Sequence, residues 1–229
     1  MKTIYVLIGP PSVGKSTWIK NNLSEKNPYI INRDELVEKV AEEIGLTYDD
    51  LFVTPPAGSK LGDVSDKYGT VVESPSNMTW SPLSYDKILD ANGKVANLFG
   101  RKLSGAKGED NIVVDMTNMN AGSRKSALNA IKGFENEYKK IAVVFKFKGS
   151  EDLIKQVAKK RAEEAKKIGK SKTIPDAAFD RMFQSYQEVT PDEGFDEVIE
   201  VDNTSTLKSV LEFKENVKWV KSFNNFRRS

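Results

Sequence analysis

The sequence reads Gly9-Pro10-Pro11-Ser12-Val13-Gly14-Lys15-Ser16-Thr17 directly after its first apolar run, residues 3–8. This stretch matches the pattern G-x-x-x-x-G-K-[ST] and stands between a predicted strand and a predicted helix, as that pattern requires. Its glycines let the backbone curl, so that successive N–H groups and the positive end of the helix face an anion. A plain glycine-rich turn is the alternative, but the position between strand and helix favours a phosphate-binding loop.

The same loop predicts how a nucleotide would be held. We expect the whole stretch, residues 9–17, to contact the nucleotide, with Lys15 bridging the β- and γ-phosphates. The hydroxyl of Ser16 would ligate Mg²⁺. The sequence contains no Asn/Thr-Lys-x-Asp motif, which guanine-specific proteins usually carry. ATP is therefore the expected nucleotide.

Short apolar runs recur along the chain, at residues 3–8, 29–32, 111–116, 140–147 and 197–201. Their β-branched, nearly continuous hydrophobicity is typical of parallel strands that are covered on both faces. Helical patterns occupy residues 15–23, 34–44, 82–103, 122–137, 151–168, 176–189 and 207–222. Strands alternating with helices predict an α/β fold of three layers, with a mostly parallel five-stranded sheet and helices on both of its faces.

The amino-acid composition limits which catalytic groups and metal ligands the protein can use. The 229 residues are 38% hydrophobic and 30% charged, which fits one globular domain over residues 1–229. The sequence has no cysteine and no histidine, which excludes disulfides, thiolate zinc sites, a cysteine nucleophile and an imidazole base. Any general base is therefore expected to be a carboxylate. The net charge of +2 predicts no global attraction to nucleic acid, so a polyanion site would need local clustering of Lys and Arg.

Acidic residues follow two of the predicted strands. Asp34 comes just after the second strand, where the carboxyl ends of parallel strands border a ligand crevice. It could take the proton of an attacking hydroxyl, or it could simply favour the helix N-terminus, since Asn32 and Glu35 have capping-box spacing. Asp115 ends the third apolar strand, the arrangement that holds Mg²⁺ directly or through water. The alternative for Asp115 is a solvated acid at a strand end.

Two segments stand apart from the strand–helix alternation. Residues 47–81 are rich in Pro, Gly and aromatic residues without a period, and we expect an insertion at the edge of the sheet or over its site. Residues 159–174 are strongly basic and lie where P-loop kinases carry a mobile helical lid, so Arg161 is expected to reach the transferring phosphoryl group. The lysines of this run could follow nucleic-acid phosphates, or form a solvated helix face with residues 163–164 pairing to residues 166–167.

Taken together, these motifs resemble the 5′-hydroxyl polynucleotide kinases, both the kinase domain of the phage enzyme and its animal counterparts. The matching pieces are residues 9–17 with Trp18, then 31–34, then 114–118, with Ser123 and Arg124 downstream. The resemblance is strong over about the first 45 residues and again from about 111 to 130. It implies the P-loop kinase fold and transfer of the γ-phosphate of ATP to a 5′-hydroxyl of DNA or RNA.

The resemblance also implies roles for individual residues. By its matching position, Asp34 would be the general base. Substrate-binding residues are then expected among the matching and neighbouring positions Arg33, Asp115, Thr117, Asn118 and Arg124, and Ser16 with Asp115 would hold the metal.

The sequence departs from the family pattern in three respects, and the first concerns how the acceptor would be bound. The phage enzyme has an acceptor-binding arginine a few residues after its catalytic Asp, and Val37 stands at that position here; the animal enzymes also lack that arginine. The insertion at residues 47–81 has no counterpart that we can align. The phosphatase motif Asp-x-Asp-Gly-Thr of the phage enzyme does not occur in this sequence, which predicts a kinase without a phosphatase.

The sequence therefore predicts an ATP- and Mg²⁺-dependent kinase whose partner is a nucleic acid with a 5′-hydroxyl end. A second hypothesis keeps the chemistry but takes a small or modified acceptor, such as a nucleoside or nucleotide, a hydroxymethylated DNA base or a sugar nucleotide. A third is a P-loop ATPase or nucleotide-binding module without an acceptor. No apolar stretch is long enough for a signal peptide or a membrane span, so we expect a cytoplasmic location, in the host if the protein is phage-encoded, and no membrane partner. Nothing in the sequence specifies an oligomeric state.

Overall fold

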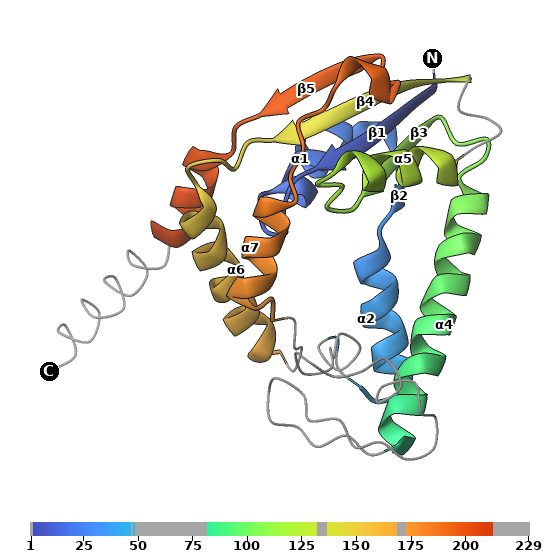
Figure 1. The fold of residues 1–229 in the computed structure, drawn as a ribbon, viewed down its shortest axis with the longest axis vertical. Coiled ribbons are helices and arrows are strands. Elements are labelled where there is room, and N and C mark those ends of the chain that lie inside the picture. Colours follow the sequence, from blue (N-terminus) through green and yellow to red (C-terminus); the bar gives the residue numbers. More distant parts are fainter. Residues whose placement is uncertain (1, 47, 49–81, 132–136, 169–172, 213–229) are drawn as a thin grey trace, which may run out of the picture.

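The computed structural model of the chain describes residues 2–46, 48, 82–131, 137–168 and 173–212. A parallel five-stranded sheet of order β2-β3-β1-β4-β5 forms its centre (Figure 1). The strands are β1 (Lys2–Ile8), β2 (Tyr29–Ile31), β3 (Asn111–Asp115), β4 (Tyr138–Phe145) and β5 (Glu197–Val201). The predicted α/β class and the five-stranded sheet are confirmed, and every strand pair is parallel.

Side chains alternate across the central strand, so β1 contributes to two separate cores. Tyr5 and Leu7 join the cluster on one face, while Ile4, Val6 and Ile8 join the cluster on the other. All five side chains are buried. Because both faces of the sheet are covered, successive side chains of β1 must all be apolar. The continuous apolar run at residues 3–8 therefore predicted a buried parallel strand.

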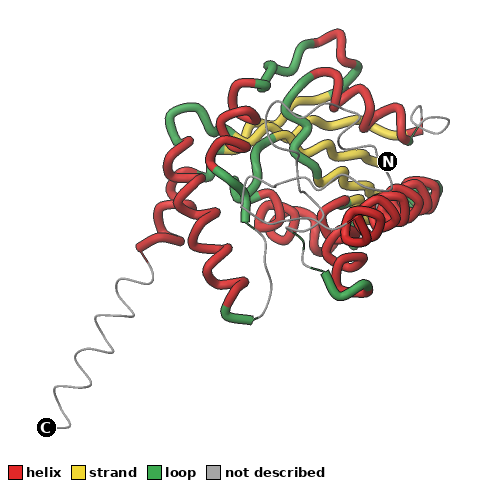
Figure 2. The backbone as a smooth tube through the Cα atoms, turned by 60° about the horizontal axis from the view of Figure 1, so that its bottom comes forward, coloured by secondary structure: helices red, strands yellow, loops and turns green. Residues whose placement is uncertain are grey.

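Helices cover both faces of the sheet (Figure 2). The α-helices are α1 (Lys15–Leu23), α2 (Arg33–Glu43), α4 (Pro82–Gly105), α5 (Ala121–Ala130), α6 (Glu151–Lys166) and α7 (Asp176–Gln184), with short 3₁₀ turns at Ser24–Lys26 and Pro191–Glu193 and a further helical stretch at residues 204–212. The first core receives Ile19 of α1, Ile154 of α6 and Phe179 of α7. The second core receives Phe99 of α4 and Ala127 of α5.

Beyond the carboxyl ends of the strands, α2 and α4 run side by side, on the opposite side of the fold from α6 and α7 (Figure 1). A third core joins α2 to α4 through Val37, Val40, Ala41, Ala91 and Val95. The first residues of α2 therefore stand at the carboxyl edge of the sheet on a support that is packed along its length.

Several boundaries differ from the sequence prediction. The helix predicted for residues 176–189 ends at Gln184, because the following backbone carbonyls accept hydrogen bonds from a buried arginine instead of continuing the helix. The strand predicted for residues 140–147 begins at Tyr138 and ends at Phe145. The helix predicted for residues 122–137 ends at Ala130, and the one predicted for 207–222 is helical from residue 204 to 212, the end of the described chain.

The insertion predicted for residues 47–81 lies outside the described residues except for Tyr48, and so does the part of the lid at residues 169–172. Helix α4 begins at Pro82, the position that the Ser81-Pro82 pair predicts for a helix start. Within the described ranges, no helix combines the length and the apolar character that crossing a bilayer requires.

Candidate active site

The phosphate-binding loop joins β1 to α1 in the curled shape that the sequence predicts. Ser12 and Gly14 both have positive φ, at 64° and 102°, and Gly14 is the N-cap of α1. The N–H of Gly9 donates to the carbonyl of Thr117 at 2.9 Å, which ties the loop to the end of β3. A Cβ on Gly9 would lie 3.0 Å from Cβ of Phe145, so a larger residue would push the loop away from the sheet.

Lys15 reaches back over this loop. Its Nζ donates to the carbonyls of Gly9 and Pro10 at 2.9 and 3.0 Å. The ammonium group therefore lies inside the curl of the loop, at the place where phosphate oxygens would approach the backbone N–H groups. Both the fold of the loop and its positive charge come from one continuous stretch of nine residues.

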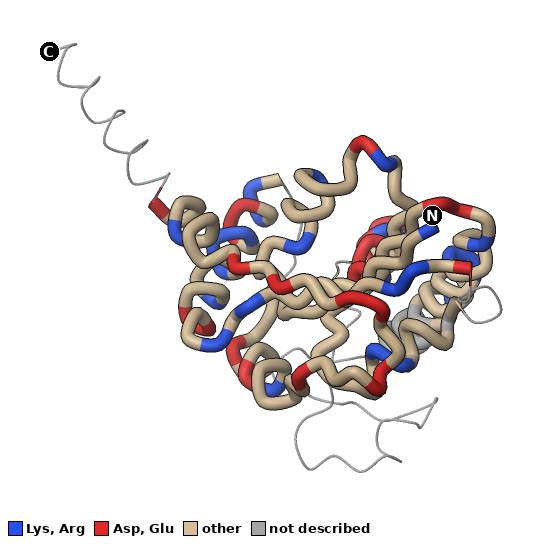
Figure 3. Tube along the Cα trace, turned by 90° about the horizontal axis from the view of Figure 1, so that it is seen from above, with Lys and Arg blue, Asp and Glu red and all other residues tan. Residues whose placement is uncertain are grey.

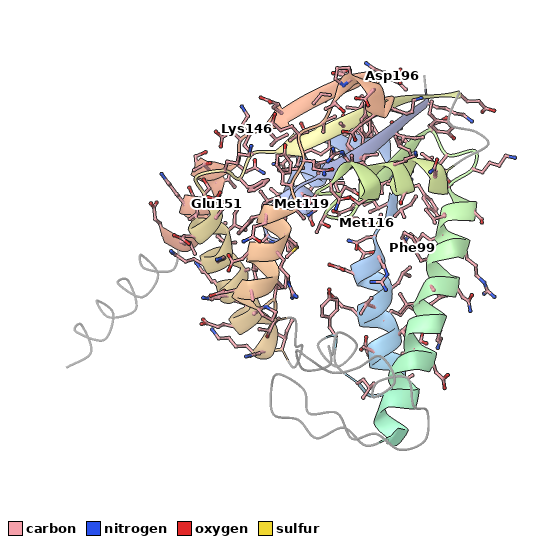
Figure 4. The ribbon with its side chains drawn as sticks, in the orientation of Figure 1. Phe99, Met116, Met119, Lys146, Glu151 and Asp196 are labelled. Carbon is pink, nitrogen blue, oxygen red and sulfur yellow. The ribbon has the colours of Figure 1, made fainter. Side chains whose placement is uncertain are left out.

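A cavity of about 430 Å³ opens beside the loop, at the carboxyl ends of the strands. It is lined by Pro11, Ser12, Gly14, Lys15, Ser16, Asn32, Arg33, Asp34, Asp115, Met116, Thr117, Ala158, Arg161, Ala162, Ala165 and Ile174. Met116, which follows β3, lies close to the first turn of α2 in Figure 4. Ligands of open α/β sheets bind at this edge, and a cavity of this volume suits a small ligand.

The cavity brings together most of the predicted site residues. Three cationic side chains, Lys15, Arg33 and Arg161, and two acidic ones, Asp34 and Asp115, line the same space. The loop, the start of α2, the end of β3 and one face of α6 each supply part of the lining. This mixture suits a polyanion that binds next to a group which must give up a proton.

Asp34 lies in the first turn of α2, and the capping of that helix falls to another residue. Asn32 is the N-cap, and its Oδ1 accepts a hydrogen bond from the N–H of Asp34 at 2.9 Å. The Asp34 side chain itself lines the cavity. The N-cap of this helix is thus Asn32, and not the carboxylate of Asp34.

Asn32 also links the two acids of the site. Its Nδ2 donates to Oδ2 of Asp115 at 3.3 Å, while its Oδ1 holds the backbone of Asp34. Asp115 is only 8% exposed, at the end of β3. Sequence reasoning found Asn32 only as a possible cap, because its second contact depends on β2 and β3 being neighbours in the sheet.

The residues that could hold a magnesium ion are oxygen donors. The Ser16 hydroxyl and the Asp115 carboxylate both line the cavity, and hard oxygen ligands are what Mg²⁺ prefers. Among the described residues, no group of three or more Asp, Glu, His or Cys side chains gathers around one point. The fit is therefore to a metal that is completed by phosphate oxygens and water, as in P-loop sites, and not to a cage made by the protein alone.

The lid side of the cavity is one face of α6. Ala158, Ala162 and Ala165 line it together with Arg161, and their spacing places all four on one side of the helix. The alanines leave the space next to the loop open, while Arg161 supplies a positive charge to it. The structure thus places the predicted arginine of the lid at the cavity.

Three lysines of α6 have partners in neighbouring helices. Lys155 pairs with Asp180 at 2.6 Å and Lys159 with Asp176 at 2.9 Å, which holds α6 to α7. Lys160 donates to backbone carbonyls of the helical stretch after β5. Basic and acidic residues are accordingly interspersed among these helices in Figure 3. The pairs form between helices, where sequence spacing along one helix could not reveal them.

Arg124 does not line the cavity, although it was expected to bind substrate. Its side chain is completely buried (0% exposed) and makes a two-pronged ion pair with Glu193, at 2.5 and 2.6 Å. It also donates to the carbonyls of Asn118, Gln187 and Glu188. The guanidinium group holds the pKa of the Glu193 carboxyl below its ordinary value through these hydrogen bonds. Arg124 therefore fastens the segment after α7 to α5, a structural role.

Asn118 is likewise placed in the wall and not in the cavity. It is 2% exposed, has a φ of 47°, and donates from Nδ2 to the carbonyl of Leu7 at 2.8 Å. Its Oδ1 has no hydrogen-bond partner within the described part of the chain. Thr117, in contrast, lines the cavity and also receives the N–H of Gly9. Of this predicted segment, Asp115 and Thr117 reach the site and Asn118 supports the loop from behind.

Asn203 is a site residue that sequence reasoning missed. It follows β5, and its Nδ2 donates to the carbonyl of Val13 at 3.1 Å. A Cβ on Gly14 would lie 2.5 Å from the same Nδ2, so Gly14 is required by contact as well as by its φ. The only available signal was an Asn at the carboxyl end of a strand, which is too common a feature to single it out.

Comparisons with known proteins place the chain in a family. A family model described as "AAA domain" matches residues 4–189. A search of curated proteins finds no match.

A search of solved structures finds matches that have low sequence identity to this chain. A suspected kinase from Chloroflexus aurantiacus J-10-fl has 11% identity and a TM-score of 0.47, over 95% of this chain and 96% of that one. A gluconokinase from Sinorhizobium meliloti 1021 has 15% identity and a TM-score of 0.36, over 95% and 96%. A structure of the PezAT toxin–antitoxin system of Streptococcus pneumoniae has 13% identity and a TM-score of 0.37, over 94% and 84%.

The family match covers well over half of the chain, and it includes the loop, both acids and the lid face of the cavity. This protein belongs to the AAA domain family.

Proposed function

We propose that the protein is an ATP- and Mg²⁺-dependent kinase that transfers the γ-phosphate to the 5′-hydroxyl of a nucleic acid. The observation that carries the proposal is the placement of Asp34 in the same cavity as Lys15 and Arg161. A carboxylate at this position can accept the proton of an attacking alcohol, which is the role that an Asp has in kinases.

In the proposed reaction, the oxygen of the acceptor hydroxyl forms a bond to the γ-phosphorus. The bond between that phosphorus and the oxygen that bridges it to the β-phosphate breaks, and ADP leaves with this oxygen. Asp34 receives the proton of the hydroxyl. Lys15 and the backbone N–H groups of the loop stabilise the charge of the phosphates, and Arg161 approaches the transferring group from α6. Magnesium, when bound by Ser16 and Asp115, supplies further positive charge to the phosphate oxygens.

Recognition of the acceptor must differ from that of the phage enzyme. Val37, which stands where that enzyme has an acceptor-binding arginine, is 1% exposed and packs in the core between α2 and α4. Arg33 lines the cavity beside Asp34 and is the cation best placed to meet an anionic acceptor. We therefore assign the phosphate of the acceptor end to Arg33.

The test is label transfer from γ-labelled ATP to a panel of acceptors: 5′-hydroxyl DNA and RNA oligonucleotides, nucleosides, and hydroxymethylated DNA. Label on an oligonucleotide supports the proposal, and Asp34→Asn should reduce its rate by about 10³-fold while ATP still binds. The matched control is Glu35→Gln, because Glu35 is the exposed neighbour on the same helix turn. Full activity in Asp34→Asn would remove the base assignment.

A small or modified acceptor is the second candidate, and the burial of Val37 together with the lysine pairs of α6 favours it. Lys155 and Lys159 are each paired with an aspartate of α7 within the protein. Measuring oligonucleotide binding against salt concentration separates the two candidates, since contacts to several phosphates give a steep negative slope and a small acceptor gives none. Phosphate release without label on any acceptor would favour the ATPase module instead.

A further inference from the structure

Helix α2 ends in a turn that sends the chain back toward the site. Gly45 has a φ of 70° and donates to the carbonyl of Glu42 at 3.2 Å, while Leu46 donates to the carbonyl of Ala41 at 2.9 Å. These two bonds with a left-handed glycine form a Schellman motif, which ends a helix and reverses the chain beside it. Tyr48 follows two residues later and lies against α2.

The ring of Tyr48 packs on the core that joins α2 to α4. This core consists of Val37, Val40, Ala41, Ala91 and Val95, and Leu46 packs on it as well. Because its ring is held by apolar contacts along α2, the hydroxyl at its tip has a defined position. That position is next to the first turn of the helix.

The hydroxyl of Tyr48 donates to Oδ1 of Asp34 at 3.2 Å. Burial raises the pKa of Tyr48 far above its ordinary value, and the charge of Asp34 raises it further. Glu38 acts on the phenol in the same direction and Arg33 in the opposite one. The phenol therefore keeps its proton at any physiological pH and acts only as a donor toward the carboxylate.

We infer that Tyr48 is a positioning residue for Asp34: it holds the carboxylate by one oxygen, so that the group meets the acceptor hydroxyl at a constant angle. This inference rests on the proposed function, in which Asp34 takes the proton. Tyr48 keeps its own proton throughout and exchanges nothing with the acceptor. Asn32 holds the backbone of Asp34 and Tyr48 its side chain, so both parts of the residue are restrained.

Restraint of this kind affects the chemical step and not the binding of ATP. A carboxylate that can rotate spends part of its time away from the reacting hydroxyl, and misplacement of a reacting group by as little as about 1 Å costs up to ~10²-fold in rate. The ring packing of Tyr48 contributes to stability, but its hydroxyl should contribute mainly to kcat.

The test compares Tyr48→Phe with the wild type in label transfer from γ-labelled ATP to a 5′-hydroxyl oligonucleotide. We expect kcat to fall about tenfold with the KM for ATP unchanged, because the ring stays and only one hydrogen bond to the carboxylate is lost. The matched control is Tyr138→Phe, which removes a hydroxyl that donates to the carbonyl of Glu109 at the other end of the sheet. Its kcat should stay at the wild-type value.

A double variant decides whether the hydroxyl acts through Asp34. Tyr48→Phe added to Asp34→Asn should cause no further loss, because the hydrogen bond then no longer serves a base. Wild-type kcat in Tyr48→Phe beside a strongly impaired Asp34→Asn would overturn this inference alone, as would a full additional tenfold loss in the double variant. A wild type that labels no oligonucleotide, or an Asp34→Asn of full activity, would overturn the proposed function and this inference with it.

Discussion

The two halves of the cavity are built in different ways. The nucleotide half comes from one continuous stretch of the chain, the loop at residues 9–17, of which Pro11, Ser12, Gly14, Lys15 and Ser16 line the cavity. The acceptor half is assembled from the starts and ends of separate elements: Asn32 and Asp34 at α2, Asp115 at β3, and Tyr48 beyond the end of α2. The first half is therefore visible as a motif, while the second exists only after the sheet and the α2–α4 pair have formed.

This difference has a consequence for mutation. Damage to the nucleotide half should remove both binding and transfer, since one loop carries the backbone N–H groups and the lysine together. Damage to the acceptor half should leave ATP binding intact and reduce transfer. Lys15→Ala acts on the nucleotide half, whereas Asp34→Asn and Tyr48→Phe act on the acceptor half, so comparing their ATP binding and label transfer tests that separation.

The largest effect is expected for Lys15→Ala. It removes the ammonium group that lies inside the curl of the loop, so both ATP binding and label transfer should be lost, with transfer reduced by more than about 10³-fold. Lys20→Ala is the control, because Lys20 is an exposed lysine of the same helix. Calorimetric titration with ATP and the label-transfer assay measure the two effects, and near-normal ATP binding in Lys15→Ala would contradict the assignment of the loop.

A smaller effect is expected for Arg161→Ala, which acts from the lid side. Loss of one charge that stabilises the transferring group should lower kcat by about 10²-fold and change ATP affinity little. Arg181→Ala, an exposed arginine on the adjacent helix α7, should behave as the wild type. If the two variants had the same kcat, the position of Arg161 at the cavity would have no catalytic meaning.

The smallest effect is expected for Asn203→Ala, which tests the support of the loop. Without the hydrogen bond to the Val13 carbonyl, the loop should hold phosphates less well, and we expect the KM for ATP to rise about tenfold at nearly constant kcat. Asn22→Ala removes a comparable bond to a helix carbonyl on the exposed side of α1 and should change neither constant. A drop in kcat with unchanged KM would instead place Asn203 in the chemical step.

Sequence reasoning predicted the residues of the site unevenly. Lys15, Ser16 and Asp34 line the cavity as predicted, because a local pattern or a strand end marks each of them. It misassigned Arg124, because an arginine after a strand-end motif can bind either a substrate or a buried carboxylate. Here it binds the carboxylate of Glu193, which is 69 residues away in the sequence. It missed Asn203, for the same reason of distance along the chain.

The amino-acid sequence alone determined the parallel sheet and the phosphate-binding loop, because apolar periodicity and backbone requirements such as the positive φ of Gly14 are local properties that residue types express directly. The tertiary structure decided what each polar side chain faces. Buried polar and charged groups must find partners, and those partners come from whichever elements the fold makes neighbours. Arg124 forms a buried ion pair with Glu193, and Lys155 of α6 pairs with Asp180 of α7. Tyr48 donates a hydrogen bond to Asp34. Each of these partners is far away in the sequence or on another element, so only the packed fold reveals the contact.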